Sequence, residues 1–467
     1  MIHINIDRKA SCSLSRQIYD ALKEAILFGT IQPGGKLPST RELAKYLNVA
    51  RNVVIECYEQ LAAEGYVYSK NGAGTYACDG VRFHPLEKDT AAKGGSNEKY
   101  SPQYEVSFRT GIPDLAEIPM KRWAQLYQKI ALDIKPSQLD YQDPFGDYRL
   151  RTQLSLYLNR ARGAQTAPKN ILITNGAAQS FHLLCGLIAQ NEYALVENPL
   201  SFGILHTLCA NSVSMEPIYM DEQGMVTAAL PDKPPKLIFT TPSHQFPTGV
   251  ILPARRRIEM IKYAQRQNAY IVEDDYDSEF RFDGSPIQSM QFLDPQRVIY
   301  VGTFSKTLMP ALRIGYMVVP DELCEKMREA KYVVDLHSPI LEQLVLGDFL
   351  ERGLFERHIR KMRKLYLKKR NALVRSLRQS FGERVKISGA EAGLHFIAAF
   401  EGVHFHEGLM KKIEENGVQI SAVSQHCLSE KTKLQYDQGL IFGYGNTTME
   451  DIDRGVKILS RVIKGER

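Results

Sequence analysis

The chain has 467 residues, of which 44% are hydrophobic and 24% charged, and its 59 basic and 53 acidic side chains leave a formal net charge of +6. This composition excludes collagen-like, low-complexity and intrinsically disordered chains, and the length allows about three folded units. The seven cysteines include no Cys-x-x-Cys pair, so neither a disulfide framework nor a metal site is expected. The amino terminus is polar, and the longest apolar stretch, residues 181–189, is too short to span a bilayer. We therefore expect a cytoplasmic protein without a membrane partner.

A change of composition separates two parts of the chain. Residues 81–105 contain paired glycines and two prolines and have almost no aliphatic periodicity, which predicts a linker. It joins an amino-terminal unit, residues 1–80, to a large unit, residues 106–467. The amino-terminal unit carries nine basic and eight acidic side chains, so its charge alone does not mark it as a nucleic-acid binder.

The amino-terminal unit has three helical patterns in succession. Apolar residues at four-residue spacing predict a first helix from Leu14 that ends near Gly29. Ser39 and Glu42 have the spacing of a capping box and predict a second helix, which Asn48 ends. A third helix is predicted over residues 51–63.

A hairpin pattern follows the three helices, with Asn71 and Gly72 at its turn. Helix, turn, helix and hairpin form the plan of a winged helix-turn-helix. Residues 12–78 resemble the GntR family of transcription regulators, because the blocks KLPS, REL and EGY occur together in that family's order. The resemblance implies that the unit binds double-stranded promoter DNA.

The resemblance assigns DNA contacts to residues that open the second and third helices or lie on the wing: Ser39, Arg41, Arg51, Asn52, Lys70 and Thr75. Arg51 and Asn52 would reach base edges in the major groove, while Arg41 and the wing residues would contact phosphates. One position departs from the family, in which a serine usually caps the third helix where this chain has Ala50. Cys57 on the same helix is expected to be packed rather than reactive.

The large unit alternates helical stretches with short β-rich runs, which predicts an α/β fold with a mostly parallel sheet. The predicted strands include residues 171–174, 193–197, 236–240, 270–274 and 297–302. Ligands of open α/β sheets bind at the carboxyl ends of the strands. The functional residues are therefore expected at the strand tips.

Four strand tips carry distinctive residues. A turn at Gly176, Ala177 and Ala178 opens a helix, a geometry that favours a phosphate. Three acids followed by a tyrosine end the strand at residues 273–276, and the segment TPSHQFPTG forms another tip at residues 241–249. The fourth tip, YVGTFSKTLMPALRIGY, sets hydroxyl groups beside Lys306 and an arginine seven residues later.

These residue types resemble the cofactor site of fold-type I aminotransferases, which bind pyridoxal 5'-phosphate. The resemblance makes Lys306 the lysine that forms the Schiff base with the cofactor and Asp274 the partner of the pyridinium nitrogen. We prefer Asp274 to Asp275 because strand alternation places it on the same face as Tyr276, the residue matched to the ring hydroxyl. The resemblance also assigns Thr303, Ser305 and Arg313 to the cofactor phosphate and, from a neighbouring subunit, Tyr141. The turn at Gly176, Ala177 and Ala178 completes the predicted cofactor residues.

A GntR-like unit, a linker and an aminotransferase-like body together resemble the MocR subfamily of regulators. The resemblance implies a homodimer whose body, with a small carboxyl-terminal subdomain from about residue 335 to 467, senses an amine, an amino acid or pyridoxal phosphate itself. It implies a regulator rather than an enzyme. Two alternatives stay open: a working aminotransferase with an appended DNA-binding-like module, and a DNA-binding protein with a degenerate body.

Two departures bear on catalysis. The NPTG motif of aminotransferases corresponds here to residues 246–249, so Phe246, which follows Gln245, takes the place of the asparagine that contacts the ring hydroxyl. The substrate-binding arginine of the enzymes is also missing, because no arginine occurs between Arg384 and Arg454. A carboxylate-bearing effector would need another donor, such as Arg109, His426 or Lys433. Full transamination is therefore not expected.

Overall fold

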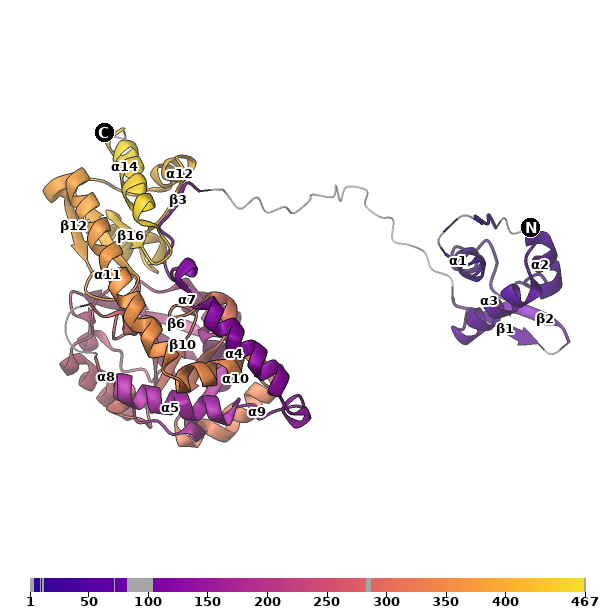
Figure 1. Ribbon diagram of the computed structural model, residues 1–467, viewed down its shortest axis with the longest axis horizontal. Coiled ribbons are helices and arrows are strands. Elements are labelled where there is room, and N and C mark those ends of the chain that lie inside the picture. The colour runs from indigo at the N-terminus through magenta and orange to yellow at the C-terminus, as the bar shows by residue number, and fades with distance from the viewer. Residues whose placement is uncertain are drawn as a thin grey trace. The chain divides into compact units, whose positions relative to one another are not determined.

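The computed structural model describes residues 4–8, 10, 12–70, 72–81, 104–282 and 287–465. The chain divides into two compact units between Tyr100 and Ser101. Both units are drawn in Figure 1, and each is treated by itself below. Most of the predicted linker lies outside the described residues, as does Asn71 of the predicted turn.

The amino-terminal unit has the predicted order of elements. Helices α1 (Leu14–Leu27), α2 (Thr40–Leu47) and α3 (Arg51–Ala63) precede strands β1 (Val67–Lys70) and β2 (Gly74–Ala77). The strands pair antiparallel and Lys70 lies opposite Gly74, so the hairpin loop has three residues where a two-residue turn was predicted. Its Gly72 has a φ of 74°, which a glycine adopts without strain.

Caps explain where these helices begin. The Ser13 side chain accepts a hydrogen bond from the Arg16 N–H, and Ser39 and Glu42 form the predicted capping box. Asn48, with a φ of 52°, ends α2 in the left-handed region. Ala50 at the start of α3 makes no side-chain cap, so the missing hydroxyl is not replaced there.

The core of this unit lies between α1, α3 and the hairpin. Ile18, Leu22, Val54 and Leu61 are completely buried. Cys57 is buried among them, and burial raises the pKa of its thiol to about 11. The thiol is therefore a packed, unreactive group, as predicted.

An eight-stranded sheet forms the centre of the large unit. Its strands are β4 (Ile171–Thr174), β11 (Gly315–Val318), β10 (Val298–Thr303), β9 (Tyr270–Asp275), β8 (Leu237–Thr240), β5 (Tyr193–Asn198), β6 (Ser214–Asp221) and β7 (Gly224–Met225), in that spatial order. β11 and β7 are antiparallel to their neighbours, and the other paired strands are parallel. The α/β fold with a mostly parallel sheet is confirmed.

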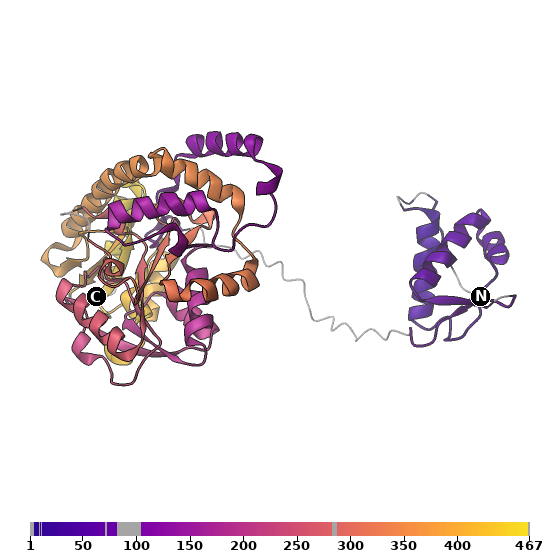
Figure 2. The same ribbon diagram turned by 90° about the horizontal axis from the view of Figure 1, so that it is seen from below.

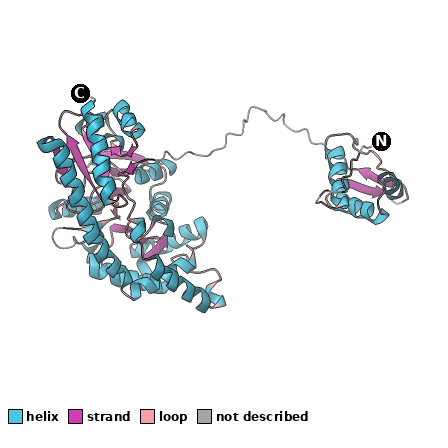
Figure 3. Cartoon of the chain, turned by 45° about the horizontal axis from the view of Figure 1, so that its top comes forward, coloured by secondary structure: helices cyan, strands magenta, loops and turns pink. Residues whose placement is uncertain are grey.

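Helices cover both faces of this sheet, as Figures 2 and 3 show. They are α4 (Met120–Asp133), α5 (Tyr148–Arg162), α6 (Ala177–Leu184), α7 (Phe202–Ala210), α8 (Ala254–Gln267), α9 (Cys324–Asp335) and α10 (Ile340–Glu351). Successive residues of the central strands enter different cores: Val272 packs with Phe181 of α6, and Ile271 packs with Met260 of α8. Burial on both faces explains why these strands are continuous apolar runs.

A second, four-stranded sheet lies toward the carboxyl end. Its order is β12 (Val385–Ser388), β13 (His395–Phe400), β16 (Gly439–Gly443) and β15 (Ser421–Ala422), and α12 (Glu407–Glu415), α13 (Glu430–Gln435) and α14 (Met449–Gly465) accompany it. The 28-residue helix α11 (Leu354–Phe381) links this part to the large sheet, as Figure 1 shows. None of the described helices is long and apolar enough to cross a membrane.

The start of the large unit belongs to this carboxyl-terminal part. Strand β3 (Val106–Ser107) pairs in parallel with β14 (Val418–Gln419), and Phe108 packs against Phe442 of β16. The sequence contained no sign of this pairing, because a two-residue strand has no measurable periodicity. Its consequence is that residues 109–111, which follow β3, run along the cavity described below.

Candidate functional site

The start of helix α3 presents the residues predicted to contact DNA bases. Arg51 and Asn52 are exposed in its first turn, and Arg41 is exposed in the first turn of α2. The Arg51 guanidinium donates a hydrogen bond from Nε to Thr40 Oγ1 over 3.3 Å, which holds it across the gap between the two helices. This is the position from which a recognition helix reaches into the major groove.

The wing carries the second group of predicted contacts. Lys70 is exposed at the end of β1, with its ammonium 5.6 Å from the Tyr68 ring centre and 5.2 Å from that of Tyr76. Thr75 is half-buried on β2. Ser39 is exposed, but its side chain accepts the Glu42 N–H as a helix cap, so part of its hydrogen-bonding capacity is already used.

A cavity of about 510 Å³ lies at the carboxyl ends of the strands of the large sheet. It brings together eight of the ten predicted cofactor residues, which are Lys306, Asp274, Tyr276, Thr303, Ser305, Arg313, Ala177 and Ala178. Gly176 does not line the cavity itself but lies next to the guanidinium of Arg313. Tyr141 does not line the cavity within one chain, and 78% of its surface is exposed.

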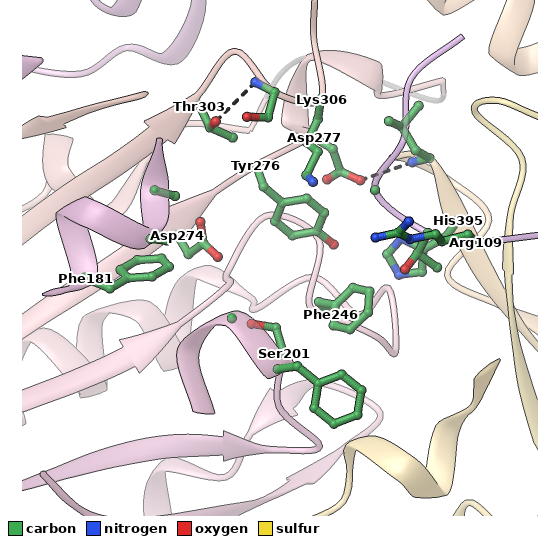
Figure 4. A pocket seen from close by; sticks show the side chains of 18 of the residues that line it. Arg109, Phe181, Ser201, Phe246, Asp274, Tyr276, Asp277, Thr303, Lys306 and His395 are labelled. Carbon is green, nitrogen blue, oxygen red and sulfur yellow. Dashed lines mark hydrogen bonds between the residues drawn. The ribbon is translucent and has the colours of Figure 1, made fainter. Parts of the chain in front are cut away.

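Lys306 projects into this cavity toward Tyr276 and Asp277, as Figure 4 shows. Burial lowers the pKa of its amine, while the carboxylates of Asp274 and Asp277 act in the opposite direction. Gly111 has a φ of 72°, and a Cβ atom there would lie 2.9 Å from the amine nitrogen, so a larger residue would strain the backbone and displace the end of the Lys306 side chain. An amine that loses its proton more readily than usual is a better nucleophile.

Asp274 and Asp275 have separate environments, as strand alternation predicted. Asp275 points away from the cavity, where it pairs with the buried Arg162 at 2.7 Å and accepts a hydrogen bond from Tyr300 at 2.5 Å. Asp274 faces the cavity, and none of the described residues donates a hydrogen bond to it. Burial, together with the charge of Asp275, raises the pKa of Asp274 to about 8. Because burying an unpaired charge is costly, a cationic partner would stabilise the ionised form of this carboxylate.

The amino terminus of α6 forms an anion cradle at one end of the cavity. The N–H groups of Ala177 and Ala178 have no acceptor among the described residues, and the helix dipole adds positive potential. Arg313 donates a hydrogen bond to the Asn175 carbonyl over 2.7 Å, which holds its guanidinium beside this turn. A Cβ on Gly176, whose φ is 95°, would lie 2.9 Å from Arg313 Nη2.

Two hydroxyl groups complete the cradle. Thr303 Oγ1 accepts the Ser305 N–H over 3.1 Å and so keeps its own hydrogen available for a ligand. Both side chains are buried at the cavity wall. Backbone amides, hydroxyls and a guanidinium together are the donors that hold a phosphate.

The opposite side of the cavity was predicted in part, because Arg109, His426 and Phe246 were named from the sequence, whereas Phe202 and His395 were not. It is lined by aromatic rings and imidazoles, namely Phe202, Phe246, His395 and His426, and by Arg109. The Arg109 guanidinium has no acidic partner among the described residues. Lys433, the other predicted donor, is not brought to the cavity, because it pairs with Glu430 on the surface of α13.

His426 lines the cavity as a neutral ring whose Nε2 can accept a hydrogen bond. Its Nδ1 lies 3.2 Å from the Leu200 carbonyl oxygen, so Nδ1 carries the hydrogen and Nε2 is left with a lone pair. Burial lowers the pKa of His426 to about 4, so the ring is uncharged at neutral pH. The prediction that His426 replaces the missing carboxylate-binding arginine is therefore not supported.

Three buried side chains, His244, Asp277 and His395, bring their ligand atoms within 4.8 Å of one another. Hydrogen bonds account for this arrangement: His244 contacts Asp277 at 3.1 Å through Nδ1 and the Gly389 carbonyl at 3.3 Å through Nε2. Since both partners are acceptors, His244 carries two hydrogens and a positive charge. Tyr276 donates to the His244 carbonyl over 2.9 Å, which fixes the phenol at the cavity wall.

Comparison with known proteins finds a matching family for each of the two units. The family of bacterial regulatory proteins named gntR matches residues 14–77, and aminotransferase class I and II matches residues 105–438. The HTH-type transcriptional regulator YhdI of Bacillus subtilis is 35% identical over 97% of this chain and 96% of its own. The probable rhizopine catabolism regulatory protein MocR of Rhizobium meliloti is 30% identical over 97% and 94%.

The body also resembles solved enzymes. Kynurenine aminotransferase of Pyrococcus horikoshii, whose crystal structure is in complex with PMP, superposes with a TM-score of 0.71 at 26% identity, covering 78% of this chain and 92% of that chain. Together with the two family matches, this defines a winged helix-turn-helix regulator with an aminotransferase-like body. The chain belongs to the MocR subfamily of GntR-type transcription regulators.

Proposed function

We propose that the body binds pyridoxal 5'-phosphate around Lys306 and that an amine entering this cavity alters how the winged helix-turn-helix unit binds promoter DNA. The observation that carries the proposal is the pairing of a buried amine with an unsatisfied carboxylate, Asp274, in one cavity that ends in an anion cradle. The phosphate would lie at the α6 turn, Arg313, Thr303 and Ser305. When bound, the cofactor supplies an aldehyde that takes up amines.

The described residues fit this cofactor. Asp274 would hold a proton on the ring nitrogen, which offsets the cost of its burial, and Tyr276 would lie beside the ring hydroxyl. Gly111 leaves room next to the Lys306 amine. Tyr141, exposed on its loop, would reach the cradle of a second subunit in a homodimer.

The cavity favours a particular class of effector. Arg109 lines the side of the cavity away from the cradle and has no acidic partner among the described residues, so it is a donor well placed for a carboxylate. The Nε2 atom of His426 accepts rather than donates, so it selects a hydroxyl or N–H group on the effector. The rings of Phe202 and Phe246 add apolar contacts. An amine that carries a carboxylate, a hydrogen-bond donor and an apolar stem meets these requirements.

Replacing the lysine tests cofactor binding. Lys306→Ala should remove the visible absorbance of the purified protein, because no amine is left to bond the cofactor aldehyde. Lys129→Ala, an exposed lysine on α4, is the control and should keep the colour. Retention of the full visible spectrum in Lys306→Ala would contradict the proposal.

An active aminotransferase is the second candidate, favoured by the complete set of Lys306, Asp274 and Arg313 and by the likeness to kynurenine aminotransferase. Phe246 and the missing arginine oppose it. Supplying amino acids with a keto acid separates the two: steady turnover supports the enzyme, and a spectral change without turnover supports the sensor.

A further inference from the structure

A second, smaller cavity lies apart from the cofactor cavity, between α5, the turn Ser278–Phe280 and α11. It has a volume of about 190 Å³ and is lined by five arginines and two glutamates, together with Ser278 and apolar residues. Ligand sites for larger molecules are usually at least about 300 Å³. The size therefore suits a small ion rather than a metabolite.

The charges of this cavity do not balance. Arg160 pairs with Glu356, and Arg162 pairs with Asp275. Among the described residues, the guanidinium groups of Arg281, Arg360 and Arg363 pair with no acidic side chain, and Arg363 donates instead to the main-chain carbonyl of Glu279 over 2.9 Å. Glu279 is the remaining acid of the cavity lining. Three positive charges against one negative charge leave a surplus of two. Burial, and the nearby Asp275, raise the pKa of Glu279, so two is the lower limit of this surplus.

Unpartnered polar atoms concentrate in the same place. Among the described residues, five buried side-chain atoms without a hydrogen-bond partner belong to residues that line this cavity: Arg162 Nε, Ser278 Oγ, Arg281 Nε, Arg281 Nη1 and Glu356 Oε2. Ser278 and Arg162 are more than nine-tenths buried. Buried polar groups are normally satisfied, so such a cluster indicates a missing partner.

The hydrogen-bonding capacities of the five atoms indicate the chemistry of the missing partner. Four can donate a hydrogen bond and one, Glu356 Oε2, accepts one. Hydrogen phosphate carries three acceptor oxygens and one O–H donor, and its charge of about −2 at neutral pH matches the surplus. We propose that this cavity is a binding site for hydrogen phosphate. Sulfate has the same shape and charge but no proton to donate to Glu356, so the site should prefer phosphate.

The site adjoins the cofactor cavity through one ion pair. Arg162 lines the phosphate cavity and holds Asp275 at 2.7 Å, and Asp275 directly follows Asp274 in β9. The site does not depend on the proposed cofactor, because the two cavities share no lining residue.

Calorimetric titration of the full-length, cofactor-loaded protein with sodium phosphate tests the proposal, with sodium sulfate and sodium chloride at equal ionic strength as comparisons. We expect saturable phosphate binding, weaker sulfate binding and no chloride binding. Arg360→Gln should weaken phosphate binding about tenfold or more, because it removes a charge-assisted contact. Arg357→Gln, an exposed arginine one turn earlier on α11 and outside the cavity, is the matched control.

Two further variants locate the ion. Ser278→Ala should weaken phosphate binding while leaving the unfolding temperature in phosphate-free buffer unchanged, because its hydroxyl has no partner to lose. Lys129→Ala, on α4 and outside both cavities, should leave phosphate affinity unchanged. Equal phosphate affinity in Arg360→Gln and Arg357→Gln, or sulfate binding as tight as phosphate, would overturn the proposal. Loss of colour in Lys306→Ala concerns the cofactor alone and leaves this test unaffected.

Discussion

At the scale of single residues, the burial of Asp274 lowers the stability of the folded protein, although the same carboxylate is the proposed partner of the cofactor ring nitrogen. Its pKa is raised to about 8, chiefly by burial, so the empty folded protein favours the protonated carboxyl while the unfolded chain ionises it near pH 4. The folded state therefore holds an extra proton, and its stability falls as the pH rises from about 4 to about 8. A bound cation would remove this penalty.

Asp274→Asn makes the penalty measurable. In cofactor-free protein we expect the free energy of unfolding at pH 8 to rise by at least about 1 kcal/mol, since one pKa unit corresponds to about 1.4 kcal/mol. At pH 5 the difference from wild type should shrink. Thermal unfolding at the two pH values checks this, and a variant less stable than wild type at pH 8 would count against it.

The neighbouring carboxylate, Asp275, should instead stabilise the folded protein, because it is paired. Asp275→Asn leaves the guanidinium of the buried Arg162 without its partner, so we expect a loss of about 3 kcal/mol or more at both pH values. The two adjacent aspartates should thus respond with opposite signs in the same unfolding measurement. Similar responses would mean that their environments have been wrongly distinguished.

At the scale of elements, helix α3 begins without a cap although its backbone is arranged for one. Ala50 has φ −64° and ψ 140°, close to the −63° and 152° of Ser39, which does cap α2. Ala50→Ser should therefore stabilise the start of α3 by about 1 kcal/mol. Hydrogen exchange of the amides in its first turn would slow accordingly. Ser39→Ala, which removes the capping box, should speed exchange at the start of α2.

At the scale of the whole molecule, most of the net positive charge lies in the large unit and not in the unit proposed to bind DNA. The winged helix-turn-helix unit has nine basic and eight acidic groups, whereas residues 106–467 have 46 and 41. Because this unit has so little net charge, its affinity for DNA should depend on where its few cationic side chains lie. Binding to DNA should therefore be sensitive to single substitutions at the start of α3.

Arg51→Ala tests this dependence. We expect it to weaken binding to the upstream region of the protein's own gene by about 1–3 kcal/mol, roughly ten- to a hundredfold, if Arg51 contacts a base. Arg16→Ala is the matched control, because Arg16 on α1 pairs with Asp20 and lies outside the predicted interface. Binding assays at fixed salt would check both. Equal affinity in the two variants would remove Arg51 from the interface.

Much of the fold could be predicted because its signals are local. Capping at Ser39 and the left-handed Asn48 depend on neighbouring residues, and the five predicted strands are runs of apolar residues. Strand alternation likewise separated Asp274 from Asp275. The hairpin loop was predicted one residue too short, since its length depends on the register of the two strands.

The sequence by itself determined the two units, the α/β class and the residues that meet at the strand tips, because periodicity, caps and motif spacing act over a few residues. Only the tertiary structure decided which distant groups meet. It placed Arg109 in the cofactor cavity through the β3–β14 pairing, left Lys433 outside it and gave Arg162 to Asp275. It also made His426 neutral. Burial and long-range pairing set these outcomes, and neither is encoded in a local pattern.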